Sequence, residues 1–126
     1  MKSPSKVSRS LRERVLKECA RPEEQRDAAF RRVVLSIPKG KVATYGQVAA
    51  AAGYPLHHRA VARLLRTEAP DRLPWQRVVG AGGAIKLHYE AGAEQRLRLQ
   101  MEGVQFSGKR VDMARFGHVF RTWELP

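Results

Sequence analysis

The chain has 126 residues, which suits one domain with a hydrophobic core and is short for two. A hydrophobic content of 43% excludes a disordered polymer, and 24 Lys and Arg against 12 Asp and Glu give a net charge of +12, which favours a polyanionic partner such as nucleic acid. No apolar run approaches the roughly 20 residues of a spanning helix. The N-terminus also lacks an apolar signal core, so no membrane partner is expected.

The cysteine and histidine content argues against disulfides and metal sites. Cys19 is the single cysteine, which leaves no intramolecular disulfide and favours a reducing compartment. His57 and His58 are adjacent, so on a helix they point about 100° apart and do not share a ligand site. We therefore expect no metal, no cofactor and a cytoplasmic protein, associated with the nucleoid if it is bacterial.

Residues 1–21 are predicted to form a basic leader, with a short helix over 11–20. The first 20 residues hold six basic side chains among several serines: Lys2, Lys6, Arg9, Arg12, Arg14 and Lys17. A flexible, solvated tail is one interpretation, and an arm that follows DNA phosphates is the other. Residues 22–126 are predicted to form one domain, and because nothing indicates a coiled coil we expect a monomer.

Three helices are predicted at the start of this domain. The first begins near Pro22, stops before Pro38, and buries apolar residues at i, i+3, i+4 and i+7: Phe30, Val33, Val34 and Ile37. The second is capped by Thr44 and ended by Gly53.

The third of these helices runs from about His57 to Arg66. Its inward face carries Val61, Leu64 and Leu65, and its opposite face carries three arginines at i, i+4 and i+7: Arg59, Arg63 and Arg66. Two short helices around a tight turn predict a helix-turn-helix that docks on DNA. A solvated arginine face is the alternative.

The second half of the domain is predicted to form a wing, a helix and a packed tail. Strands at 78–79 and 84–87, joined by the glycine-rich turn 80–83, would make a β-hairpin. A last helix from about Gly92 to Glu102 would turn Leu97, Met101 and Val104 inward, with Gly103 as its cap. The tail would pack back on the domain through Met113, Phe116, Val119, Phe120 and Trp123. The predicted fold class is thus mostly α with a small β-hairpin wing, a winged helix-turn-helix.

Several short motifs occur in an order that resembles the O6-alkylguanine-DNA alkyltransferases, over roughly residues 30–106. They are Ile37-Pro38-Lys39-Gly40, Thr44-Tyr45-Gly46, Arg59-Ala60-Val61, Pro74 with Arg77-Val78, and Glu102-Gly103-Val104. Trp75 stands where these enzymes carry the cysteine that accepts the alkyl group, and Gln76 where they carry its histidine. The tryptophan resembles a subgroup, the alkyltransferase-like proteins, which bind alkylated DNA without repairing it themselves.

The residue chemistry argues against alkyl transfer independently of the resemblance. Accepting an alkyl group needs a soft nucleophile, normally a thiolate activated by a base. The Trp75 indole offers only an N–H donor, and the Gln76 amide does not titrate near neutrality. Cys19 lies far along the chain, and a lone cysteine is usually an inert small hydrophobe.

The resemblance implies roles for the remaining site residues. Arg59 would fill the gap left by a flipped guanine, Tyr45 would press on its 3′ phosphate, and Thr44 at the same helix start could hold a phosphate. Trp75 would line the lesion pocket with Gln76, His88 and Tyr89, within the loop 86–90 that forms its other wall. Glu102 could accept a hydrogen bond from Gln76, while Arg77 looks structural. Arg63 and Arg66 complete the expected DNA contacts.

Three functional hypotheses follow. The first is a non-enzymatic sensor that flips O6-alkylguanine out of duplex DNA after minor-groove docking and flags it for nucleotide excision repair proteins. The second is a sequence-specific winged-helix regulator that reads bases with its arginine stripe. The third is a residual alkyltransferase that uses Cys19.

Overall fold

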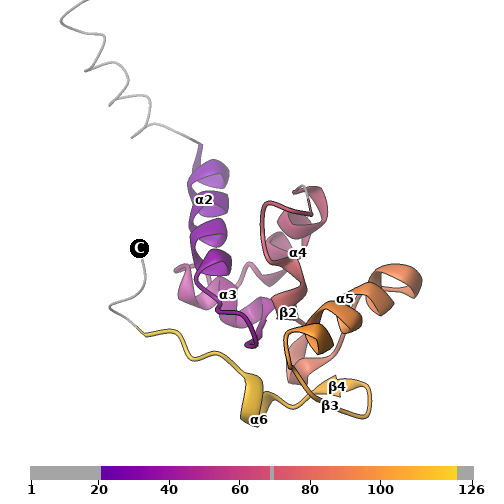
Figure 1. The fold of residues 1–126 in the computed structure, drawn as a ribbon. Coiled ribbons are helices and arrows are strands. Elements are labelled where there is room, and N and C mark those ends of the chain that lie inside the picture. The colour runs from indigo at the N-terminus through magenta and orange to yellow at the C-terminus, as the bar shows by residue number, and fades with distance from the viewer. Residues whose placement is uncertain (1–20, 69, 122–126) are drawn as a thin grey trace, which may run out of the picture.

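The computed structural model describes residues 21–68 and 70–121, and the predicted leader helix and Trp123 lie outside them (Figure 1). Within these residues no helix has the length and apolar character needed to cross a bilayer. The fold is mostly helical, and its elements follow in this order: α2 (Pro22–Leu35), β1 (Ala43–Thr44), α3 (Tyr45–Ala51), α4 (His58–Thr67), the 3-10 turn η1 (Trp75–Arg77), β2 (Val78–Val79), the 3-10 turn η2 (Ala81–Gly83), α5 (Tyr89–Met101), β3 (Phe106–Ser107), β4 (Arg110–Val111) and α6 (Met113–Phe116).

The main core lies where α2 packs on α3 and α4. Pro22 occupies the first turn of α2, where its missing N–H costs nothing, and the acidic Glu23 and Glu24 suit the positive end of the helix. The predicted buried face of this helix is confirmed, because Phe30, Val33 and Val34 are fully buried, and Ile37, which follows the end of α2, is 1% exposed. This cluster is the support on which the next two helices are mounted.

The helix-turn-helix is confirmed by α3 and α4, which lie side by side across a short turn (Figure 1). Thr44 caps α3 in a reciprocal pair with Gln47, with N···O distances of 3.0 and 2.9 Å. Gly53, at φ +94°, ends this helix. On α4, Val61 and Leu64 are buried, and the predicted arginines are exposed: Arg59, Arg63 and Arg66.

The predicted hairpin between 78–79 and 84–87 is wrong. β2 pairs instead in parallel with β1, with Ala43 opposite Val78 and Thr44 opposite Val79. Both valines of β2 are fully buried, so this strand lies in the core and has no solvent face for a wing. The hairpin of the structure lies later in the chain, where β3 pairs antiparallel with β4.

The last long helix differs from its prediction in its start and in its buried face. α5 begins at Tyr89 rather than near Gly92, and Leu97 and Met101 are 56% and 75% exposed, so their predicted inward orientation is wrong. Leu99 and the polar Gln95 are buried in their place. The Gln95 amide donates to the main-chain carbonyls of residues 76 and 78, at 3.1 and 2.8 Å, and thereby pairs carbonyls that would otherwise be buried alone.

The tail packs on the domain as predicted for most of its apolar residues. Met113 and Phe116 contact a second cluster around Leu99, while Phe120 contacts the main core. Val104 is 2% exposed and Gly103, at φ +93°, follows the end of α5, as predicted. Val119 is 77% exposed, so its predicted packing is wrong.

Gly83→Ala is expected to destabilise the fold by about 2 kcal/mol more than Gly53→Ala. Both glycines have positive φ, so alanine at either position adds backbone strain. The two positions differ in their surroundings, because a Cβ at 83 would lie 2.5 Å from the Val111 carbonyl oxygen, whereas a Cβ at 53 would meet nothing within 4 Å. Urea unfolding of the two variants measures the difference. Equal losses would show that the contact between η2 and β4 relaxes freely.

Candidate nucleic-acid interface

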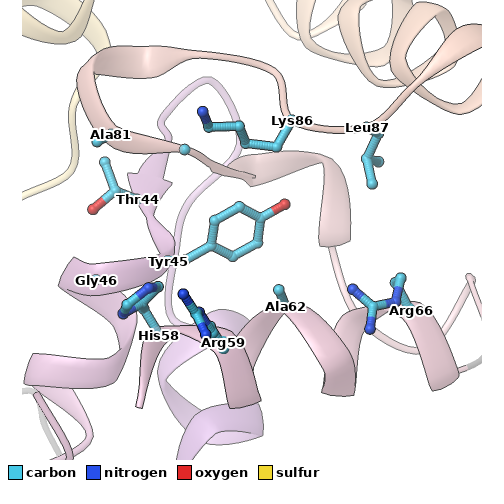
Figure 2. A pocket seen from close by; sticks show the side chains of 11 residues that line it. Thr44, Tyr45, Gly46, His58, Arg59, Ala62, Arg66, Ala81, Lys86 and Leu87 are labelled. Atoms are coloured by element: carbon cyan, nitrogen blue, oxygen red, sulfur yellow. The ribbon is translucent and has the colours of Figure 1, made fainter. Parts of the chain in front are cut away.

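Two adjoining cavities lie between α4, the segment 80–87 and the start of α5. The outer cavity, of 590 Å³, is lined by Thr44, Tyr45, Gly46, His58, Arg59, Ala62, Arg66, Gly80, Ala81, Lys86 and Leu87 (Figure 2). The inner cavity, of 320 Å³, is lined by Tyr45, Ala62, Leu65, Arg66, Trp75, Leu87 and Ala91. Four residues, Tyr45 among them, belong to both walls, so the two cavities form one hollow.

Tyr45 is positioned by the pairing of β1 with β2. This pairing sets the first turn of α3 beside Gly80, and Figure 2 shows the Tyr45 ring between α4 and the segment that carries Lys86. Burial raises the pKa of the Tyr45 hydroxyl, and the charge of Arg66 opposes that rise only in part. The phenol is therefore protonated at neutral pH and can donate a hydrogen bond inside the hollow.

The mouth of the hollow is cationic. Arg59 and Arg66 project into it from one face of α4, and Lys86 faces them from the opposite wall (Figure 2). No described acidic residue forms a salt bridge with any of the three. Their charges are thus available to a polyanion. The third predicted arginine, Arg63, is exposed on α4 but lines neither cavity.

Trp75 forms part of the inner wall. It begins the 3-10 turn η1, is partly buried, and its ring lies 5.3 Å from the Arg98 guanidinium carbon, measured to the ring centroid. Its indole N–H is buried without a hydrogen-bond partner among the described residues. The indole therefore offers an apolar surface to whatever occupies the cavity and no nucleophile.

Gln76 and Arg77 face away from the hollow, into a polar network centred on Glu102. The Gln76 amide donates to Glu102 Oε2 at 2.8 Å, and Arg77 Nε donates to Glu102 Oε1 at 3.0 Å. Arg77 also donates to the Ile37 carbonyl at 2.9 Å, and the Gly40 N–H donates to Glu102 at 3.1 Å. The network ties η1 to the ends of α2 and α5, and both predictions made for it, the Gln76 contact and a structural Arg77, are confirmed.

The Glu102 carboxylate is kept charged by this network. Burial alone would raise its pKa, but the hydrogen bonds from Arg77, the Gly40 N–H and Gln76, together with the Arg77 charge, outweigh burial and lower the pKa below its ordinary value. A carboxylate held in this way keeps the segment before β2 in place over a wide pH range.

The structure brings only part of the predicted site together. Tyr45, Trp75, Arg59 and Arg66 line the hollow, whereas Gln76, His88 and Tyr89 line neither cavity, although Leu87 and Ala91 on either side of the latter two do. Tyr89 is 94% exposed at φ +54°, and its ring centroid lies 6.2 Å from that of His88. Thr44 lines the outer cavity. Its N–H donates to the Gln47 side-chain oxygen and its hydroxyl oxygen accepts from the Gln47 main-chain N–H, so a phosphate at the Thr44 N–H would have to displace the Gln47 side chain.

Sequence reasoning missed several wall residues. Lys86, Leu87 and Ala91 fall in or beside the loop 86–90 that was expected to form a wall, so a signal for them existed. Ala62 and Leu65 carried no signal, since an alanine and a leucine on a helix are ordinary packing residues. Among residues 21–68 and 70–121, no group of three or more His, Cys, Asp or Glu residues is placed to hold a metal ion.

Comparisons with known proteins place this geometry in a family. The sequence profile described as "6-O-methylguanine DNA methyltransferase, DNA binding domain" matches residues 25–104, more than half of the chain. A "DNA base-flipping protein" of Escherichia coli is 42% identical over 86 residues, covering 67% of this chain and 67% of that protein. "Alkyltransferase-like protein 1" of Schizosaccharomyces pombe is 39% identical over 75 residues, covering 57% of this chain and 69% of that protein.

A solved structure supports the same assignment. The S. pombe protein Atl1, in complex with damaged DNA containing O6-carboxymethylguanine, superposes with a TM-score of 0.68 at 28% identity, covering 77% of this chain and 97% of that one. The match spans the helix-turn-helix fold described above. The chain therefore belongs to the family of the 6-O-methylguanine DNA methyltransferase DNA-binding domain, among relatives that are named for base flipping and for likeness to alkyltransferases.

Proposed function

We propose that this protein binds O6-alkylguanine in duplex DNA, turns the damaged base out of the stack into the hollow under Tyr45 and Trp75, and does not transfer the alkyl group. The observation that carries the proposal is the indole of Trp75 on the inner wall, beside a cationic mouth of Arg59, Arg66 and Lys86. The relatives named for base flipping, and the Atl1 complex with damaged DNA, support the same function.

The energetics of base flipping fit these residues. Taking a guanine out of the stack costs a few kcal/mol, and a damaged base costs less than an intact one. A guanidinium that stacks in the vacated gap stabilises the flipped state by about 1–3 kcal/mol. Arg59 is exposed at the mouth of the hollow and held by no acid of the described chain, so it is the side chain placed to supply this term.

The side chains that line the inner cavity support the proposal that no alkyl group is transferred. Its described side chains are one tyrosine, one arginine, one tryptophan and small or aliphatic residues, and none is a soft nucleophile. Gln76, in place of the activating histidine, is committed to Glu102. Cys19, the only thiol of the chain, lies outside the described residues.

A sensor that leaves the lesion in place requires other proteins to remove it. We therefore propose that the complex is handed to nucleotide excision repair proteins and that the protein binds as a monomer. Leu97 and Met101 form an exposed apolar pair on α5, at positions that line none of the cavities of the DNA-facing hollow.

A paired titration tests the proposal. The full chain is titrated into a duplex with one O6-methylguanine and into its unmodified twin at one salt concentration, and intact-protein mass is measured after incubation with the lesion. Tighter binding to the lesion with no gain in mass is expected. Equal affinities would exclude lesion recognition, and a gain of one methyl group would identify an alkyltransferase that uses Cys19.

A further inference from the structure

A third hollow adjoins the inner cavity at Trp75. It has a volume of 190 Å³ and shares four lining residues with the inner cavity: Leu65, Arg66, Trp75 and Ala91. Because these four side chains line both hollows, a group in the inner cavity lies next to the third hollow. We call it the distal chamber.

The distal chamber differs from the mouth in that carboxylates stand beside Arg66, which lines both. The residues that it adds to the shared wall include two glutamates, Glu68 at the end of α4 and Glu94 on α5. The chain has 12 acidic residues against 24 basic ones, so two carboxylates in one small hollow of a DNA-binding protein run against the overall charge. Carboxylates accept hydrogen bonds from charged donors, so this hollow has carboxylate acceptors that the lining of the outer cavity lacks.

Each glutamate has one side-chain ion-pair partner that holds it at the chamber. Arg31 of α2 contacts Glu68 at 3.1 Å, and Arg98 contacts Glu94 at 2.7 Å. A carboxylate has about four acceptor sites, so these pairs leave capacity for a further donor. Arg98 also lies over the Trp75 ring, which links the acidic end of the hollow to its indole wall.

We propose that the distal chamber selects the O6 substituent of the lesion, and that it favours substituents long enough to pass Trp75 that end in a cationic or hydrogen-bond-donating group, such as an aminoalkyl chain. This inference rests on the proposed function, because the guanine must occupy the inner cavity for its substituent to reach the chamber. An ammonium group there donates to Glu68 and Glu94, whereas an alkyl end or a carboxylate end has no hydrogen-bond donor to offer them.

The test compares three duplexes of one sequence, which carry O6-(4-aminobutyl)guanine, its near-isostere O6-pentylguanine, or O6-(3-carboxypropyl)guanine, each against the undamaged twin. The quantity measured is the ratio of aminobutyl to pentyl affinity. Because Glu94 is half exposed, we expect this ratio to be about fivefold higher in the native protein than in the Glu68→Gln, Glu94→Gln double variant. The carboxypropyl lesion should gain affinity in the double variant, because Arg66 then lines the chamber without the two negative charges.

Glu90→Gln is the matched control, because it removes the same charge from an exposed position of α5 that lines none of the three hollows. It should leave the ratio unchanged, and thermal unfolding of all variants reports any loss of fold. An aminobutyl-to-pentyl ratio that is the same in the native protein and the double variant would overturn the inference. If both lesions bound no better than undamaged DNA, the proposed function itself would fail.

Discussion

Arg59→Ala should lower affinity for an O6-methylguanine duplex by about tenfold, and affinity for the undamaged twin by much less. The reason is that the arginine acts mainly on the flipped state, where a stacked guanidinium contributes about 1–3 kcal/mol. Its position supports this role, since it is exposed at the mouth of the hollow, close in the wall to Tyr45 and Ala62 (Figure 2). Fluorescence anisotropy with the two duplexes, at one salt concentration, measures both affinities.

Arg63→Ala provides the matched control for this measurement. It removes the same charge from the same helix, at an exposed position that lines neither the outer nor the inner cavity. It should weaken binding to both duplexes alike, and it should reduce the slope of log affinity against log salt concentration by about one. If Arg59→Ala kept the native preference for the lesion, the intercalating role would belong to another side chain.

The sequence predicted those elements whose signals are local. The i, i+3, i+4, i+7 pattern from Phe30 to Ile37, the cap at Thr44 and the stop at Gly53 each lie within a few residues of what they specify, and all three are confirmed. The arginine face of α4 was found for the same reason. The helix-turn-helix and its exposed arginine face were therefore largely predictable.

The errors arose where the partner of a segment is distant along the chain. Two valines followed by glycines, Val78 to Gly83, favour a local hairpin, yet β2 pairs with the residues before α3. Gln95 gave no sign of being buried, because its place depends on the main-chain carbonyls of η1 and β2 that it caps. Once this polar residue faces inward, Leu97 and Met101 must face outward on the same helix.

The candidate site was predictable in its chemistry and less so in its geometry. Trp75 and Tyr45 could be identified as wall residues by resemblance. The placement of Arg98 and Glu94 near Trp75 depends instead on how α5 packs against η1. The outward ring of Tyr89 follows from its left-handed backbone at φ +54°, a conformation that side chains rarely adopt and that no local pattern indicated.

Glu102→Ala should destabilise the protein by about 3 kcal/mol at neutral pH, because it leaves the Arg77 guanidinium, the Gln76 amide and the Gly40 N–H without their shared acceptor. The carboxylate side chain is 10% exposed, so water cannot readily replace it. Chemical denaturation measures the loss. Glu94→Ala is the control, since its pair with Arg98 is solvent-exposed and should contribute less than about 1 kcal/mol.

The same variant should lose a component of the pH dependence of stability. The folded-state pKa of Glu102 lies below its unfolded value, so its contribution is fully present above the ordinary glutamate pKa of about 4.3 and is lost as the pH falls through the folded value. The native protein should therefore lose stability in this acidic window more steeply than Glu102→Ala does. Parallel curves for the two proteins would mean that the Glu102 carboxylate is no better stabilised in the fold than in the unfolded chain, and that the network around Arg77 is held by packing alone.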